Sequence, residues 1–400
     1  MPHVLALAAC LPLAGQFWTV DDDGGANFAS VAEAIASPLV ADGDVLLIEP
    51  GFYASATLTK SLTLLGSQAG AQPSVAALTV DGVARFDLQN LAFLSLDITA
   101  VPGRSRVDGC TVISGMKIED AAELTVTRSL VEGTNLTLCG ETALRITGAS
   151  NVQLVDSTFR GGDGFDEFFE GLAGYGGAAV FVWDTSRVWI AGCDLTGGGG
   201  SDSNTPLWGF DPGEGGDALL AGKDARVDVR GSSFHVLAGG PQNYWDPSSP
   251  IDGHAISLGF GLTPAVEYSG VTTSGPVDPD AVLVSPPRPY LYVRGQTGPG
   301  ETRRLYLYGP AGATALVATS FQDAFAELPL VQTAPVWLDL TSLVELFPAA
   351  LAGPDVAFNV VWIQPANPSL AGLAYLVQAV LVEPSGALVG TNSSNLLLGF

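Results

Sequence analysis

The sequence predicts an all-β chain in which a β-solenoid is followed by a small antiparallel β-sandwich. Only 14% of the 400 residues are charged, below the usual quarter, and 49 are Gly. An apolar pattern recurs through the first 280 residues, with spacings that fall to 19. Beyond a Pro-rich segment, short apolar runs separated by Gly and Pro replace this repeat, as in an antiparallel sandwich. A chain of this length can bury a large core.

The charge of the chain is strongly acidic and unevenly distributed. There are 41 acidic and 16 basic residues, which gives a formal net charge of −25. Residues 281–400 hold seven acidic and four basic residues, a net of −3, which leaves −22 for residues 1–280. Phosphate binding needs clustered Lys and Arg, so this balance excludes a nucleic-acid partner.

The first residues predict an export signal and no transmembrane segment. Residues 4–20 are the most apolar stretch, but Gln16 interrupts them, and no other run approaches the ~18 apolar residues of a spanning helix. We interpret residues 1–16 as a signal peptide, with a first buried strand as the alternative. The expected location is secreted or at the cell surface. Residues 7–10 also fit a lipoprotein box with Cys10 as the lipid acceptor.

The first regular element is a short helix. Ser30 followed three residues later by Glu33 is typical of a capping box, and the pattern continues to Ile35. A helix at this point would cover the open end of a solenoid, which otherwise exposes unpaired backbone groups.

The repeat that follows is an apolar residue, a small residue three positions later and a second apolar residue two positions after that. Its spacings are 24, 19, 19, 28, 36, 39 and 39 residues. A unit near 19 residues is too short for a helical repeat and fits one coil of a β-solenoid, with period-2 alternation inside each unit. The first residues of the units are Leu64, Leu88, Val107, Val126, Leu154, Ile190, Val229 and Tyr268.

The small residues of the repeat predict an internal ladder made of Cys110, Ser129, Ser157, Cys193 and Ser232. Cys110 and Cys193 would lie three coils apart, roughly 14 Å at the spacing of neighbouring strands. That is too far for a disulfide, so we expect two buried thiols that pack as small apolar groups. Because there is no C-x-x-C pair, the sequence predicts no Cys-based zinc site.

A set of short segments near the start of the chain forms a further pattern: 19–25, Phe28, 31–35, 45–48, 50–53 and 62–66. With these segments, residues 17–66 resemble the opening of right-handed parallel β-helix proteins of the pectin-lyase-like and pectinesterase superfamily. The resemblance implies this fold for residues 17–280. It implies little about activity, because the superfamily includes lyases, esterases, glycoside hydrolases, epimerases and inactive surface proteins. The catalytic motifs of pectinesterases are not found downstream, so esterase activity is not carried over.

A second domain is predicted over residues 281–400, after the Pro-rich hinge at 285–289. Seven apolar runs in this region predict a β-sandwich. The last segments resemble C-terminal modules of large secreted bacterial proteins, notably planctomycete ones. The runs are 291–293, 304–308, 315–318, 336–340, 356–363, 373–382 and 396–400.

Three insertions explain why the repeat lengthens. They follow Phe159, Leu195 and Phe234, at the same point of successive coils, so we expect them on one side of the solenoid. They hold ten acidic residues, eight aromatic residues and one basic residue, Arg160. Aromatic faces suit sugar rings, and carboxylates accept hydroxyl hydrogen bonds, bind Ca²⁺ or act as an acid–base pair. The alternative is that the aromatic residues only fix long loops in place. The insertions span residues 160–176, 197–217 and 238–254.

One pair of residues within the insertions supports a more specific prediction than the others. Segments 142–144, 178–180, 217–219 and 254–256 align at one coil position, which stacks Asp217 and His254 roughly 5 Å apart. A carboxylate at that distance orients an imidazole, as in acid–base sites. The catalytic candidates are Asp217, His254, Asp163 and Asp166. The substrate-binding candidates are Trp208, Tyr244, Trp245 and Tyr175.

Residues 253–259 resemble a polygalacturonase motif that contains a functional His, here His254. The paired-Asp motifs and the later Arg-x-Lys of that family are missing, and Ala255 stands where the motif has Gly. An Asp–His pair that only supports the base of the insertion therefore remains the alternative to catalysis.

Two functions follow from these residues. The first is an exported protein that binds or cleaves a neutral polysaccharide, as a glycoside hydrolase or a lyase, with Ca²⁺ as a candidate ligand. A lyase is less favoured, because residues 1–280 contain three Lys, none of them in the insertions. The second is a non-catalytic cell-surface, adhesion or structural protein.

Overall fold

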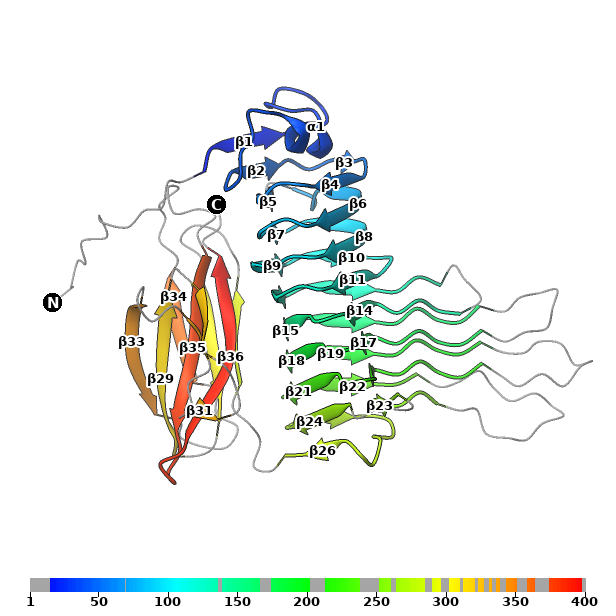
Figure 1. Ribbon diagram of the computed structural model, residues 1–400, viewed down its shortest axis with the longest axis vertical. Helices are drawn as coiled ribbons and strands as arrows, with labels where there is room; N and C mark the ends of the chain where they lie inside the picture. Colours follow the sequence, from blue (N-terminus) through cyan, green and yellow to red (C-terminus); the bar gives the residue numbers. More distant parts are fainter. Residues whose placement is uncertain are drawn as a thin grey trace, which may run out of the picture.

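The computed structural model contains a parallel β-helix followed by antiparallel sheets (Figure 1). The predicted all-β fold class is confirmed. The structure describes residues 15–68, 70–135, 139–165, 174–201, 213–237, 252–259, 264–284, 290–295, 302–309, 312–320, 323–326, 331–332, 336–338, 343–350, 358–363 and 374–397. Residues 1–14 of the predicted signal peptide, which include Cys10, lie outside these residues.

One wall of the solenoid is an eleven-stranded parallel sheet, called sheet A here, with about one strand per coil. Its strands, in spatial order, are β1 (Phe17–Val20), β2 (Val45–Ile48), β5 (Thr63–Gly66), β7 (Asp87–Gln89), β9 (Arg104–Asp108), β12 (Glu123–Thr127), β15 (Asn151–Val155), β18 (Arg187–Ala191), β21 (Arg226–Arg230), β24 (Ala265–Ser269) and β26 (Val282–Leu283).

The remaining walls belong to a fifteen-stranded sheet, called sheet B, whose two arms join at β8 (Ala92–Thr99). One arm is β11 (Met116–Glu119), β14 (Leu144–Thr147), β17 (Val180–Val182), β20 (Leu219–Ala221) and β23 (Ile256–Leu258). The other is β10 (Thr111–Val112), β13 (Leu130–Glu132), β16 (Thr158–Arg160), β19 (Asp194–Thr196), β22 (Ser233–His235) and β25 (Thr272–Thr273). Before β8 lie β3 (Phe52–Tyr53), β4 (Ala56–Leu58) and β6 (Ser74–Asp81).

The strand register confirms the repeat. Leu64 pairs with Leu88, Leu88 with Val107 and Val107 with Val126. The series continues through Leu154, Ile190, Val229 and Tyr268. All of these except the last are fully buried in one continuous core. Coils of different length keep one register because the extra residues leave the sheets as insertions.

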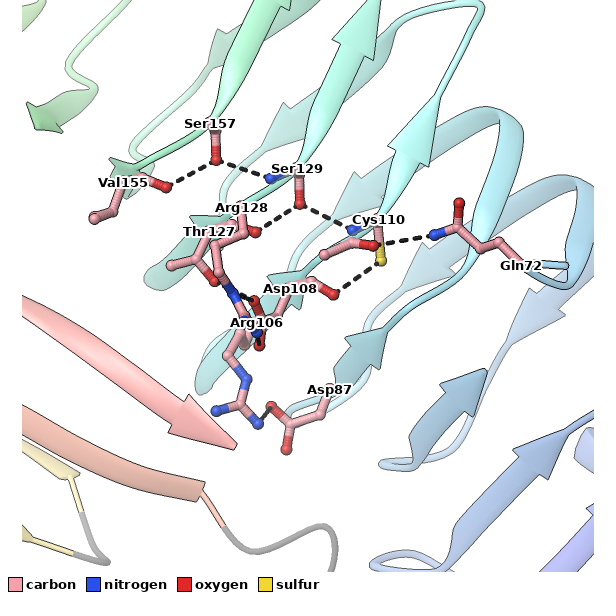
Figure 2. Close-up of polar contacts among 11 residues, drawn as sticks. Gln72, Asp87, Arg106, Asp108, Cys110, Thr127, Arg128, Ser129, Val155 and Ser157 are labelled. Atoms are coloured by element: carbon pink, nitrogen blue, oxygen red, sulfur yellow. Dashed lines mark hydrogen bonds and ion pairs between the residues drawn. The ribbon is translucent and has the colours of Figure 1, made fainter. Parts of the chain in front are cut away.

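The small-residue ladder is present and is also hydrogen-bonded (Figure 2). The backbone N–H of Cys110 donates to Ser129 Oγ at 3.2 Å, and the N–H of Ser129 donates to Ser157 Oγ at 3.1 Å. Cys193 and Ser232 repeat the contact at 3.1 Å. The thiols are free and buried, as predicted, and burial raises the pKa of Cys110 and of Cys193 to about 12. Both thiols are therefore un-ionised and inert at neutral pH.

The corner before each ladder residue needs a left-handed backbone. Gly109 and Gly192 have φ of 62° there, and Gly231 has 51°. Arg128 and Asp156 take the same position with φ of 48° and 45°. Glycine adopts this region without a steric penalty, so part of the high glycine content belongs to these corners.

The predicted helix is α1 (Val31–Ala36), at the N-terminal end of the solenoid (Figure 1). Ser30 Oγ accepts the N–H of Glu33 at 3.1 Å, and the Glu33 carboxylate accepts the N–H of Ala29 at 3.0 Å. Val31 and Ile35 face the core, so the helix covers the first coils.

Strand pairing changes from parallel to almost entirely antiparallel after β26. A three-stranded sheet contains β27 (Tyr290–Gly295), β28 (Thr302–Tyr308) and β34 (Phe358–Ile363). A five-stranded sheet contains β31 (Val331–Gln332), β36 (Leu388–Leu397), β35 (Ala374–Val382), β29 (Thr314–Ser320) and β33 (Leu343–Ala350), and a pair contains β30 (Asp323–Ala326) and β32 (Val336–Leu338). The division into two domains at 280 stays a prediction.

Candidate functional site

The insertions leave and re-enter the solenoid at the same places on successive coils. They follow β16, β19 and β22 and end before β17, β20 and β23, and a shorter insertion joins β13 to β14. They project from one side of the solenoid, away from sheet A (Figure 1). The stacking expected from the sequence is therefore present in their described parts.

The bases of these insertions form a second hydrogen-bonded structure, called the glycine array here. Its outgoing segments are 133–135, 161–165 and 197–201, and its returning segments are 139–142, 174–178, 213–217 and 252–254. Segments of the same kind pair between successive coils. On the outgoing side, Gly161 N–H donates to Thr196 O at 2.9 Å, and on the returning side, Gly176 N–H donates to Glu214 O at 2.8 Å. Outgoing and returning segments pair as well, so the insertions share one backbone network.

A continuous series of bonds joins the two sets of segments. Gly162 N–H donates to Glu141 O at 2.9 Å, Gly177 to Gly162 at 2.7 Å, Gly198 to Gly177 at 2.9 Å and Gly216 to Gly198 at 2.7 Å. A Cβ on any of these four glycines would overlap a neighbouring carbonyl oxygen. Glycine is needed here for close backbone approach, a reason that the sequence interpretation missed.

Asp217 and His254 are side by side, on successive returning segments. Asp217 Oδ1 accepts the backbone N–H of His254 at 2.7 Å and lies 3.4 Å from His254 Nδ1. The His254 side chain is 45% exposed and that of Asp217 is 19% exposed. The carboxylate thus holds the base of the third insertion and also faces the imidazole. A catalytic role for either residue stays a prediction.

Asp163 lies on an outgoing segment, and its side chain hydrogen-bonds to the backbone of the glycine array. Its Oδ1 accepts the N–H of Gly199 at 2.7 Å, and its own N–H donates to Asn135 Oδ1 at 2.7 Å. Tyr175 lies on a returning segment and is exposed. The other four candidates, Asp166, Trp208, Tyr244 and Trp245, lie outside the described residues.

An aromatic pair that the sequence analysis did not single out lies on the outer face of sheet B. Phe181 and Trp183 are half-buried and stack with ring centroids 5.4 Å apart and planes 8° apart. The guanidinium carbon of Arg145, one coil earlier, lies 4.9 Å from the Phe181 ring centre. The indole rests against Gly222, where a Cβ would overlap it. Strand alternation was the available signal, because Val180 and Val182 point inward and place Phe181 outward.

Arg145, which contacts Phe181, also lines a groove of about 560 Å³ at the base of the shortest insertion. Lys117, the register partner of Arg145, lines it too, and Thr134 Oγ1 donates to the Glu141 carboxylate at 2.9 Å. Its size is that of a small-molecule site. The lining residues are Ser114, Gly115, Met116, Lys117, Thr134, Glu141, Thr142 and Arg145.

Carboxylates close enough to share a cation occur, within the described ranges, at Asp21, Asp22 and Asp23. This turn lies in the N-terminal coil, not in the insertions. Asp22 Oδ2 accepts the N–H of Phe52 at 3.1 Å, and Asp21 Oδ1 accepts the N–H of Asp23 at 3.1 Å. Ca²⁺ binding by the insertions stays a prediction. In the described part of the chain, no helix has the length and apolar character to cross a membrane.

No protein-family model matches the chain, and no curated protein matches it. Among solved structures, a pectin methylesterase in complex with a hexasaccharide is similar, with 13% identity, 67% of this chain and 93% of that chain covered, and a TM-score of 0.32. The enzymatically active domain of bacteriophage CBA120 tailspike protein 2 has 10% identity, with 96% of this chain and 71% of that chain covered, and a TM-score of 0.31. Identities this low bear on the fold alone.

Proposed function

We propose that this protein is an exported, glycan-binding β-helix protein that holds a polysaccharide on the outer face of sheet B beside the insertions. The stacked pair Phe181 and Trp183 carries the proposal. Half-buried aromatic rings on a flat parallel sheet offer apolar area next to polar groups, which is what the faces of sugar rings need. The groove that Arg145 also lines supplies donors from Lys117, Arg145 and Thr142 and an acceptor from Glu141.

The glycine array supports an extended ligand rather than a small one. It fixes the bases of successive insertions at the regular spacing of the coils, so the backbone geometry beside the outer face of sheet B is regular over several coils. A polymer that runs along the solenoid can contact several coils at once, which a single small molecule cannot do. The acidic residues of the insertions favour a neutral glycan, since an acidic surface repels a polyanion.

Cleavage of the glycan is the second candidate, and the pair Asp217 and His254 favours it. The imidazole is half-exposed and its Nδ1 faces a carboxylate, as in an oriented acid–base pair. Binding is preferred, because the same carboxylate oxygen already accepts the backbone N–H of His254 at 2.7 Å. Glycoside hydrolysis also calls for two carboxyl groups flanking the bond.

A glycan array followed by titration calorimetry tests the proposal. We expect binding to at least one neutral polysaccharide, with affinity reduced about tenfold or more in Phe181→Ala and Trp183→Ala, as for aromatic residues at the centre of an interface. Phe52→Ala is the matched control, because Phe52 is an exposed aromatic residue on the N-terminal coils. A reducing-end assay on the bound glycan separates binding from cleavage. Absence of both binding and product would overturn the carbohydrate function.

A further inference from the structure

The outer face of sheet B presents a row of side chains in which two cations are neighbours. The strands β8, β11, β14 and β17 follow one another along the solenoid (Figure 1), and their register aligns one outward residue from each. Lys117 and Arg145 are both exposed and occupy neighbouring places in this row. The row, in coil order, is Asp97, Lys117, Arg145 and Phe181.

Two adjacent cations without a counter-ion are unusual in a chain with a net charge of −25. Within the described residues, Lys117 and Arg145 form no ion pair with an acidic side chain, whereas several other basic side chains of the solenoid do. Like charges directly opposite each other on neighbouring strands destabilise a sheet, and a negatively charged ligand would relieve their repulsion. The basic side chains that are paired are Arg106, Arg128, Arg160, Lys223 and Arg230.

The two cations line the groove of about 560 Å³ together with hydroxyl groups that can donate to the same ligand. Ser114 and Thr142 supply these hydroxyls, whereas Thr134 Oγ1 donates to the Glu141 carboxylate at 2.9 Å. A guanidinium, an ammonium and hydroxyl groups around one concave site are suitable donors for a carboxylate, sulfate or phosphate group. The groove therefore has the donor set of an oxyanion site.

Arg145 connects the groove to the stacked pair Phe181 and Trp183. Its guanidinium carbon lies 4.9 Å from the centre of the Phe181 ring, a cation–π contact that holds the charge beside the aromatic surface. Successive coils are roughly 5 Å apart, so Lys117 lies about 10 Å from Phe181. A sugar stacked on the aromatic pair is therefore close enough for an acidic group, on that sugar or on its neighbour, to reach both cations.

The surrounding carboxylates limit the number of charges that such a ligand carries. Asp97 is the register partner of Lys117 one coil toward the N-terminus, and Glu141 lines the groove itself. A polymer with an acidic group on every unit would place some of them against these carboxylates and against the acidic insertions, where like charges repel. A glycan that is neutral apart from widely spaced acidic groups avoids this repulsion.

We propose that the groove is an anion subsite of the glycan surface, in which Lys117 and Arg145 together bind one acidic substituent of an otherwise neutral glycan. The substituent is a carboxylate, sulfate or phosphate group, to which Arg145 offers paired donors and Lys117 a point charge. This inference rests on the proposed function, since the aromatic pair has to hold the sugar chain. It gives the groove a task of its own, which is selection among glycans that the aromatic pair binds equally well.

Matched oligosaccharides test the anion subsite. An array presents each neutral oligosaccharide beside its carboxylated, sulfated and phosphorylated forms, and titration calorimetry gives the dissociation constants of the bound ones. We expect at least one acidic form to bind tenfold or more tightly than its neutral form. This ratio of dissociation constants should fall toward one in about 0.5 M salt, because salt screens exposed charges.

The same ratio should depend on the two cations. Lys117→Met removes one charge, leaves the contact between Arg145 and Phe181 in place, and should reduce the ratio at least threefold. The double variant Lys117→Met/Arg145→Gln should abolish the preference for the acidic form. Arg85→Gln is the matched control and should leave the ratio unchanged, because Arg85 is an exposed residue between β6 and β7, outside the groove.

The outcomes that contradict the anion subsite differ from the one that contradicts glycan binding. Equal affinity for the acidic and neutral forms would overturn the anion subsite and leave glycan binding standing. An unchanged ratio in the double variant, or in Lys117→Met if the double variant does not fold, would show that the charge is recognised elsewhere. Binding to no oligosaccharide of either kind would overturn the proposed function, and the anion subsite with it.

Discussion

At the residue scale, the Asp217 side chain forms a hydrogen bond directly with the backbone. Its Oδ1 accepts the N–H of His254 at 2.7 Å. Asp217→Asn keeps an acceptor at this position, so we expect stability and glycan affinity close to the unchanged protein. Asp217→Ala leaves the N–H without its partner and should lower the free energy of unfolding by about 1–3 kcal/mol, as for hydrogen bonds to charged groups. Thermal unfolding and calorimetric titration measure the two effects.

The same two variants, Asp217→Asn and Asp217→Ala, distinguish a structural role of Asp217 from a catalytic one. A general acid or base is lost equally in Asp217→Asn and Asp217→Ala, because neither side chain exchanges a proton near neutral pH. Loss of a measured cleavage activity in Asp217→Asn, with stability unchanged, would contradict the supporting role and establish a catalytic one.

Asp108 is fully buried on the outer face of sheet A. Burial alone would raise its pKa, but the charge and hydrogen bonds of the Arg128 guanidinium outweigh burial and hold the pKa of this carboxyl below its usual range. The stability that it contributes is therefore complete above its unfolded pKa of about 3.9 and is lost as the pH falls through the lower folded value. Asp108→Asn should lower the free energy of unfolding by about 3 kcal/mol near neutral pH, because the Arg128 guanidinium loses the fully buried carboxylate that accepts two of its hydrogen bonds.

Chemical unfolding as a function of pH checks this prediction. The difference between the unchanged protein and Asp108→Asn should be constant above about pH 5 and should shrink below about pH 4, as the carboxyl becomes protonated in both states. A difference that grows as the pH falls would contradict the sign of the shift. Asp163→Asn is the control, since Asp163 is an acidic residue of the glycine array, away from Arg128.

Prediction from sequence succeeded for residues that the repeat itself aligns. Thr142, Ala178, Asp217 and His254 share a coil position because their neighbours Leu144, Val180, Leu219 and Ile256 pair in register. It failed for Arg145, Phe181 and Trp183, which come together from positions 36 residues apart. Aromatic residues were sought in the insertions, where composition is unusual, whereas these lie on strands, where an outward aromatic residue has no compositional signal.

At the element scale, the glycine array should unfold when a single methyl group is added. Gly177→Ala and Gly198→Ala each place a Cβ against a backbone carbonyl oxygen, which cannot turn away as a flexible side chain can. We expect the hydrogen bonds on both sides of the substituted residue to break, at a cost of about 2–4 kcal/mol for two bonds and the clash. Limited proteolysis should then cut the insertions much faster, while the β-helix stays intact.

Gly82→Ala is the matched control for this experiment. Gly82 has a positive φ of 65°, and a Cβ there meets nothing within 4 Å, so only the backbone preference is disturbed. Equal protease sensitivity in Gly82→Ala and Gly177→Ala would show that close approach is not what the array requires.

The helix could be predicted from the sequence in detail, whereas the packing at the bases of the insertions could not. The helix α1 follows from local chemistry, since Ser30 and Glu33 are three residues apart and complete the cap alone. The glycine array depends on contacts between segments tens of residues apart, such as Gly162 with Gly198. A glycine-rich run has the same composition in a tight corner, a flexible loop and a packed array, so only the stacking of coils distinguishes them.

At the scale of the whole molecule, the two ends of the solenoid differ in how well they are covered. The N-terminal end is covered by α1, whose Val31, Ala34 and Ile35 are buried. At the other end, Val282 and Leu283 of β26 are 54% and 62% exposed. The two residues of β25 are exposed as well. In a solenoid each coil contacts only its neighbours, so stability is a sum over coils and their interfaces, and an uncovered last coil frays first.

Amide hydrogen exchange along the chain tests this asymmetry. Protection should be lowest in β24 to β26 and highest in the central coils around β12 and β15. Val266→Ala, in β24, should speed exchange only in the last coils, because fraying there leaves the other interfaces intact. Val126→Ala, in β12, removes the same methyl groups from a fully buried central position and should cost about 2 kcal/mol across the whole solenoid. Equal and local effects of the two variants would show that the coils do not unfold as a coupled series.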